Sequence, residues 1–342
     1  MATLGANVLT LADWAKRLDP QGKVPTIVEL LSQTNQILDD MLWKEGNLPT
    51  GHRLTIRTGL PTVAWRLLNQ GVQPSKSTTA QIDEQTGMLE AWSEVDKDLA
   101  DLNGNTSAFR LSEAQAFLEA MNQEMAQTLF YGNSGVAPEE FTGLSIRYSA
   151  TSAANGQNIL SAGGSGSDNT SVWLVVWGDN TIHGIFPKGS KAGLDHSDLG
   201  LETVEATAGI AGNRMLAYRD RFQWKAGVAL KDWRFAVRIA NVDVSDLVGA
   251  TATQATTAAT ELVKLMSRAI DRIPAMGMGR ASFYANRTVA SHLRIQALNK
   301  STSAIAIEPA LNQFGDNIFK LRFLGIPLGV TDQILNTEAA VS

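Results

Sequence analysis

The chain has 342 residues, of which 44% are hydrophobic and 18% are charged, with a formal net charge of −5. This length predicts about two domains, or one large domain with extensions, and a sizeable core. The charged fraction is below the roughly 25% of ordinary soluble domains, which indicates either a surface covered by neighbouring molecules or simply a neutral surface. The sequence contains no cysteine and no long block of basic residues, which excludes disulfides and thiol catalysis and disfavours a sequence-reading nucleic-acid binder.

Residues 1–50 are expected to form an arm with two short helices. The second helix has the clearer start, because Thr26 and Glu29 have the spacing of a capping box. Charged residues interrupt the start of the chain, so no signal peptide is expected. No apolar run approaches the roughly 20 residues of a membrane span. We therefore expect synthesis in the cytosol and no contact with a membrane.

Residues 51–102 are expected to form one long β-hairpin with a polar tip. Apolar and polar residues alternate in each arm, as in half-buried strands. The outgoing arm is basic and the return arm acidic, so opposite charges would face one another across the strands. The tryptophans of the two arms either stack on each other or anchor a subunit interface, where tryptophan is enriched. The candidate interface residues are Arg53, Arg57, Trp65, Arg66, Lys76, Glu90, Trp92 and Glu94.

Two helices are well marked in the remainder of the chain. Residues 111–131 carry a Met- and Leu-rich stripe that includes Met121, which predicts burial in the subunit's own core. Residues 256–273 repeat the helical spacing, and Pro274 closes that helix. A helical piece is also expected near residues 289–299. Strands are expected over residues 172–178, 222–230, 233–240, 282–289 and 319–335.

No motif for catalysis stands out, and we expect no catalytic residue, no cofactor and no bound metal. The best metal candidate is the segment DHSD with a histidine upstream of it, and its ligand types are legitimate. However, no two histidines have the i, i+4 spacing of a helical zinc motif, so a solvated polar loop is the simpler interpretation. The alternative is a metal-dependent hydrolase that uses His183, Asp195, His196 and Asp198.

Two long strings resemble the major capsid proteins of short-tailed bacteriophages: VWGDNTIHGIFPKGSKAGLDHSDLG, residues 176–200, and RFQWKAGVALKDWRFAVRIANVDV, residues 221–244. FYANRTV and LGIPLGVTDQI resemble the closing strands of that family. The family is similar to the Hong Kong 97 capsid fold, which is α+β. The resemblance implies a structural subunit that assembles into pentamers and hexamers of an icosahedral head around double-stranded DNA. A related encapsulating-shell or tail protein is a further alternative.

The resemblance also implies how the chain is divided and what it meets. A virion capsid built in the bacterial cytoplasm implies a portal and a separate scaffolding protein, with or without a decoration protein, and non-specific contact with DNA. Lys76 at the hairpin tip could form an isopeptide cross-link, as in some relatives, although a solvated lysine is the simpler interpretation. The implied parts are an N-terminal arm (1–50), an extended hairpin called the E-loop (51–102), a peripheral domain (103–169) with spine helix 111–131, an axial domain (170–245), and a remainder of both domains (246–342) with helix 256–273 and the closing strands.

Overall fold

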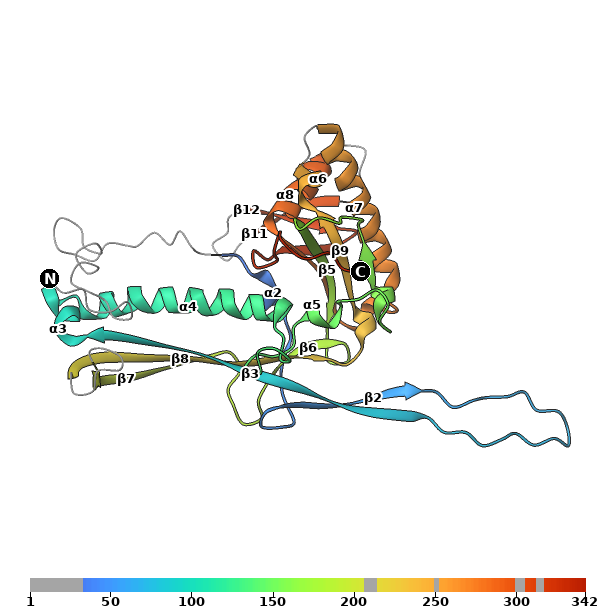
Figure 1. The fold of residues 1–342 in the computed structure, drawn as a ribbon, viewed down its shortest axis with the longest axis horizontal. Coiled ribbons are helices and arrows are strands. Elements are labelled where there is room, and N and C mark those ends of the chain that lie inside the picture. Colours follow the sequence, from blue (N-terminus) through green and yellow to red (C-terminus); the bar gives the residue numbers. More distant parts are fainter. Residues whose placement is uncertain (1–32, 206–213, 249–251, 299–304, 312–316) are drawn as a thin grey trace.

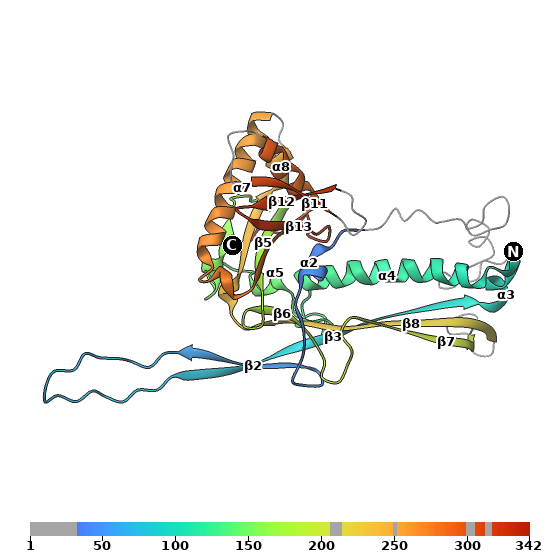
Figure 2. The ribbon, with the colours of Figure 1, turned by 180° about the vertical axis from the view of Figure 1, so that it is seen from behind.

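The computed structural model describes residues 33–205, 214–248, 252–298, 305–311 and 317–342 of the chain. Figure 1 shows two regions: a body of sheet and helices, and a long, flat arm in which one helix lies on a narrow sheet. A β-hairpin projects from the arm on the side away from that helix's N-terminal end (Figures 1 and 2). None of the described helices is long and apolar enough to cross a membrane.

The thirteen described strands form one sheet that runs from the body into the arm. The strands of the body are β1 (Trp43–Glu45), β4 (Ile159–Ser161), β5 (Asn169–Trp177), β6 (Ile182–Phe186), β9 (Ala236–Asp243), β10 (Arg280–Ala285), β11 (Ile305–Leu311), β12 (Asn317–Phe323) and β13 (Ile326–Val330). Its helices are α2 (Gln36–Asp40), α5 (Leu144–Arg147), α6 (Val244–Val248), α7 (Ala252–Arg272) and α8 (Arg287–Leu298). The arm and hairpin contain β2 (Gly51–Gly59), β3 (Thr78–Asp96), α3 (Lys97–Ala100), α4 (Thr106–Tyr131), β7 (Leu194–Glu205) and β8 (Arg214–Leu230).

Strand β5 separates the two apolar cores of the body and is buried along its whole length. Successive side chains of a strand point to opposite faces of the sheet, so β5 contributes alternately to each core. Val172 and Leu174 pack with residues of α7 and α8. Trp173 and Val175 pack with the C-terminal end of α4. This double burial explains why β5 is a continuous apolar run rather than an alternating one.

In the arm, helix α4 lies on the sheet formed by β3, β8 and β7. Strand β8 is the central one, because it pairs with β3 through Trp92↔Arg221 and with β7 through His196↔Phe222. Phe117 of α4 stacks on Phe222 with ring centroids 6.1 Å apart. The expected unit 170–245 is therefore divided in space: β5, β6 and β9 lie in the body, whereas β7 and much of β8 run along α4.

The hairpin is shorter than the sequence pattern predicts. Strand β2 pairs only with the first half of β3, from Gly51↔Gln85 to Gly59↔Thr78, and the second half of β3 pairs with β8 instead. Residues 60–77 contain no strand, so the expected continuation through Trp65 is wrong. Proline explains the stop, because Pro61 and Pro74 have no N–H to donate to a ladder.

Three expected helices are confirmed, with shifted ends. The helix expected over 111–131 is α4, which begins five residues earlier at Thr106. The helices expected over 256–273 and near 289–299 are α7 and α8. The second helix of the N-terminal arm is reduced, within the described residues, to α2 followed by strand β1. The first helix and the capping-box residues lie outside the described residues.

Candidate assembly interface

The root of the hairpin is fixed to the rest of the subunit by a buried ion pair. Arg147 of α5 donates two hydrogen bonds to the carboxylate of Glu84, at 2.7 and 2.6 Å, and both side chains are largely buried. Gly51 lies against the partner strand, since a Cβ there would be 2.1 Å from the carbonyl oxygen of Glu84. A one-sided disruption of this pair would leave a buried charge unpaired, which is strongly destabilising. The root of the hairpin is therefore held rigidly against α5.

Beyond the root, the hairpin is held by its own ladder and one exposed ion pair. Arg53 donates two hydrogen bonds to Asp83 across the strands, at 2.6 and 2.7 Å. Arg57 faces Thr79 rather than an acid. The expected pairing of a basic arm with an acidic arm is therefore realised at Arg53 alone among the basic residues proposed for it.

The tip of the hairpin, residues 60–77, is exposed and unexpectedly apolar. Leu60, Val63, Trp65 and Leu68 each expose more than four-fifths of their side chains. The remaining candidates of this region, Arg57, Arg66 and Lys76, are also exposed. Contiguous exposed apolar residues at one end of a molecule indicate a surface that meets another molecule.

The candidates on the return arm lie instead on the sheet of the subunit itself. Glu90 accepts hydrogen bonds from Arg221 at 2.8 Å and from the indole N–H of Trp92 at 2.7 Å. The bond from Arg221 lowers the pKa of the Glu90 carboxyl. Arg219 lies 4.5 Å from the ring centroid of Trp92 and 2.9 Å from Glu94. These three residues thus bind β8.

Of the two alternatives for the tryptophans, stacking of Trp65 on Trp92 does not occur, because Trp65 is fully exposed at the tip whereas Trp92 lies under Arg219. The alternating pattern of residues 51–102 could not predict this contact, because the arginines of β8 that contact Trp92 are more than 120 residues away in sequence.

The residues of the hydrolase alternative are not brought together. His183 lies opposite Ala229 on β8, whereas His196 lies opposite Phe222 on the same strand. At about 3.4 Å per residue these two positions are roughly 24 Å apart. His196 contacts Asp220 at 3.0 Å. The side chains of the described residues form no group of three or more metal-binding types that could hold an ion.

The two acids of the alternative are also used in other ways. Asp198 accepts a hydrogen bond from Arg110 of α4 at 2.8 Å, and this bond lowers the pKa of the Asp198 carboxyl. Asp195 is half exposed and lies 3.8 Å from Lys191. The segment DHSD therefore ties β7 to α4 and to the adjacent loop, and the hydrolase alternative loses its geometric basis.

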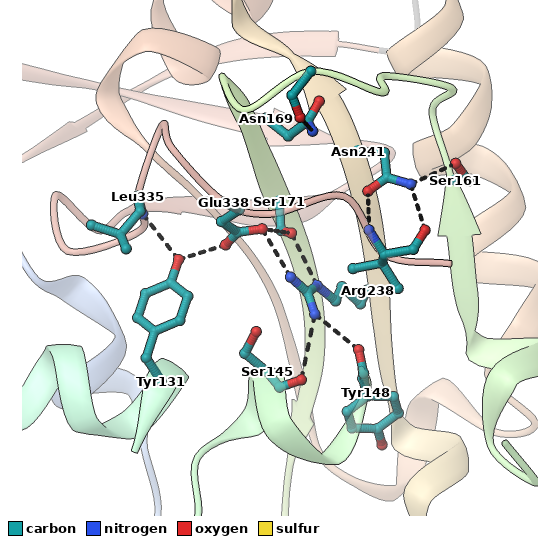
Figure 3. A network of polar contacts seen from close by, with 12 residues as sticks. Tyr131, Ser145, Tyr148, Ser161, Asn169, Ser171, Arg238, Asn241, Leu335 and Glu338 are labelled. Atoms are coloured by element: carbon teal, nitrogen blue, oxygen red, sulfur yellow. Dashed lines mark hydrogen bonds and ion pairs between the residues drawn. The ribbon is translucent and has the colours of Figure 1, made fainter. Parts of the chain in front are cut away.

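A buried polar network that the sequence analysis did not predict anchors the C-terminal segment in the body (Figure 3). Arg238 of β9 donates to Glu338 at 2.9 Å, and both side chains are about 95% buried. Glu338 also accepts from Tyr131 at the end of α4 and from Ser171 of β5. Arg238 donates further to the carbonyl oxygen of Tyr148 at 2.9 Å. Three elements and the C-terminal segment therefore meet at one ion pair.

The sequence did contain one signal for this network. Arg238 stands inside the apolar run FAVRIA, and an arginine in a buried strand requires a partner for its charge. The partner Glu338 is 100 residues further along the chain, so neither spacing nor periodicity could identify it.

Comparisons with known proteins give one clear family. The family model of the major capsid protein GP7 matches residues 19–342. The fold is similar to a chain in the structure of bacteriophage Epsilon15, with a TM-score of 0.75 and 34% identity, over 100% of this chain and 99% of that chain. The capsid of bacteriophage JBD30 has a TM-score of 0.48 and 12% identity, over 95% and 99% of the two chains. No curated protein sequence matches the chain.

Proposed function

Because the chain belongs to the family of the major capsid protein GP7, we propose that its copies assemble into pentamers and hexamers that close as an icosahedral bacteriophage head around double-stranded DNA. Its α+β fold is the Hong Kong 97-like capsid fold. We infer that the chain has no catalytic role in the head and acts as a structural subunit of the virion.

The observation that carries this proposal is the apolar tip of the projecting hairpin. Trp65 and Leu68 are exposed to solvent at the tip of the projecting hairpin. A lone two-stranded hairpin is marginally stable in water, and exposed apolar side chains gain free energy when a second surface covers them. In a shell, the adjacent subunit supplies that surface. Each contact can be weak, because every subunit is held at several contacts at once.

The division of the chain follows the same proposal. We assign residues 1–50 to an N-terminal arm, the projecting hairpin within 51–102 to the E-loop, and α4 within 103–169 to the spine of the peripheral domain. Of residues 170–245, which the sequence assigned to the axial domain, we assign β5, β6 and β9 to that domain and β7 and much of β8 to the peripheral domain beside α4. Residues 246–342 complete both domains. The exposed residues at or near the tip are the remaining candidates for contact with a neighbouring subunit. The charged candidates are Arg57, Arg66 and Lys76, and the apolar candidate is Trp65.

The proposed partners are other copies of the chain, a portal and a separate scaffolding protein, with or without a decoration protein. Contact with packaged DNA would be non-specific, since the sequence has no long basic block. It would also be weak, since a net charge of −5 does not favour a surface that binds phosphates. Assembly would take place in the cytoplasm of the bacterial host.

Negative-stain electron microscopy of the purified protein, alone and with its scaffolding protein, tests the proposal. We expect closed shells of uniform diameter in at least one of the two preparations. Monomers alone, in both preparations and at high protein concentration, would contradict the proposed function.

A further inference from the structure

No described strand pairs with the edge of β2 that faces away from β3. The side chain of Asn47 binds both backbone groups of Arg53, accepting from its N–H at 2.7 Å and donating to its carbonyl oxygen at 2.9 Å. The backbone groups of Arg53 therefore point away from β3. Since hydrogen-bonded and non-hydrogen-bonded pairs alternate in an antiparallel ladder, the backbone groups of Thr55 and Arg57 also point away from β3. Within the described part of the chain, no partner meets these two N–H and two C=O groups.

This free edge faces a groove. The groove has a volume of about 840 Å³, and its lining residues are 52–60, Asn180 and 231–234. No residue of β3 lines it, so it lies on the outward side of β2. An unpaired strand edge with open space beside it is a ready template for another strand.

The charge of the groove favours an acidic occupant. The charges of Arg53 and Arg234 are neutralised by ion pairs with Asp83 and Asp232. Two further cations of the groove are not fully neutralised. Arg57 faces a threonine across the ladder, and Lys231 shares the carboxylate of Asp179 with Lys44.

The chain carries a second free edge with the opposite charge. Among the described strands, β7 pairs only with β8, and its twelve residues LDHSDLGLETVE contain four acids and neither lysine nor arginine. Arg110 and Arg219 neutralise Asp198 and Glu202, and the exposed Lys191 lies 3.8 Å from Asp195. With these three cations counted against four acids, the strand keeps a net negative charge.

We propose that the free edge of β2 pairs with the free edge of β7 of a second copy, so that the sheet continues from one subunit into the next. This inference rests on the proposed function, because it specifies one contact between subunits of the shell. The two edges are different surfaces, so the contact is head-to-tail, which is the kind that closes into rings when it repeats.

Proline at the outward positions tests the edge directly. Proline removes one N–H and blocks the approach of a strand, yet the ladder to β3 does not use the N–H of residue 55. The variant is Thr55→Pro. The matched control is Gln81→Pro, because Gln81 faces Thr55 across the ladder and its N–H points to the opposite edge of the hairpin. Both variants should melt like the wild type.

We expect Thr55→Pro to yield at least tenfold fewer shells than Gln81→Pro, measured by sedimentation. Equal shell yields from the two variants, whether both high or both low, would overturn the proposal. Wild-type protein is assembled in parallel, so that its failure to form shells counts against the proposed function, whereas normal shells from Thr55→Pro count against the edge pairing.

Cysteine cross-linking tests the identity of the second strand, and the chain has no native cysteine to interfere. Copies carrying Thr55→Cys are mixed with copies carrying Leu201→Cys or Glu202→Cys, which sample both faces of β7. We expect oxidation to give a cross-linked dimer with at least one of these. Val136→Cys, exposed but outside the sheet, is the control and should give none. Absence of any cross-link to β7 in assembled shells would overturn its assignment.

Discussion

At the scale of single residues, the pair Arg238–Glu338 is a buried ion pair that joins β9 to the C-terminal segment of the body. Both charges lie in low-dielectric surroundings, and each has hydrogen bonds beyond the pair itself. Desolvation offsets much of the attraction within such a pair. Its loss is costly chiefly because the remaining charge stays buried.

We expect Arg238→Met to lower the free energy of unfolding by about 3–5 kcal/mol, since Glu338 would then be buried without its cation. Arg234→Ala is the control, because the Arg234–Asp232 pair is more exposed and its loss should cost less than about 1 kcal/mol. Urea denaturation of the two variants measures the difference. Similar midpoints for both would show that the network does not anchor the body.

His183 gives a second prediction at this scale, through pH. Burial, followed by the nearby Lys231, lowers the pKa of His183 from 6.5 to about 4. The unfolded chain therefore binds more protons than the folded chain between these two values, so stability is lost as the pH falls from 6.5 towards 4. The loss from this residue amounts to roughly 3 kcal/mol when the whole window is crossed.

The measurement is the free energy of unfolding at pH 7 and at pH 4.5 for the wild type and for His183→Gln. We expect the variant to lose about 2 kcal/mol less over this interval, because glutamine does not titrate. Equal losses in both proteins would mean that His183 does not carry the shift.

At the scale of elements, helix α4 was predictable and the hairpin was only partly so. The Met- and Leu-rich stripe predicted burial, and Met121, Met125 and Leu129 are indeed buried. Leu118 of the same stripe is 39% exposed. A helical period reports which face is apolar, but it does not report how far along the helix the covering element extends.

The substitution Met121→Asp tests the buried part of the stripe. An aspartate in this apolar site should cost at least about 3 kcal/mol of unfolding free energy. Leu118→Asp, on the same stripe but 39% exposed, should cost much less. Thermal melts of the two variants provide the comparison, and equal shifts would show that the helix does not discriminate between the two positions.

The hairpin shows why the candidate interface was only partly predictable. Alternation identified β2 and β3 correctly, but it continued past Pro61, where the ladder ends. The sequence pattern predicts ion pairs between the acids of the return strand and the arginines of the outgoing strand, because these arginines are near in sequence. In the structure Glu84 pairs with Arg147, and Glu90 with Arg221. Charge counts identify a surplus but not the distant element that neutralises it.

At the scale of the whole molecule, the residues that form the cores are separate from the residues that we propose to contact other copies. The body contains the two large apolar cores, whereas residues 60–77 contribute no buried side chain. The family was identifiable from two long strings of sequence, but the arrangement of arm, body and hairpin depends on long-range strand pairs such as β3 with β8.

The central claim is that the tip of the projecting hairpin, residues 60–77, assembles the shell without stabilising the subunit that carries it. Its most direct test replaces residues 61–76 with a short Gly-containing turn and records a thermal melt and sedimentation velocity of that variant. We predict a cooperative melt at the wild-type temperature, because the removed residues contribute to neither core, together with monomers and no shells. Shells of normal size from this variant, or loss of its cooperative melt, would contradict the account.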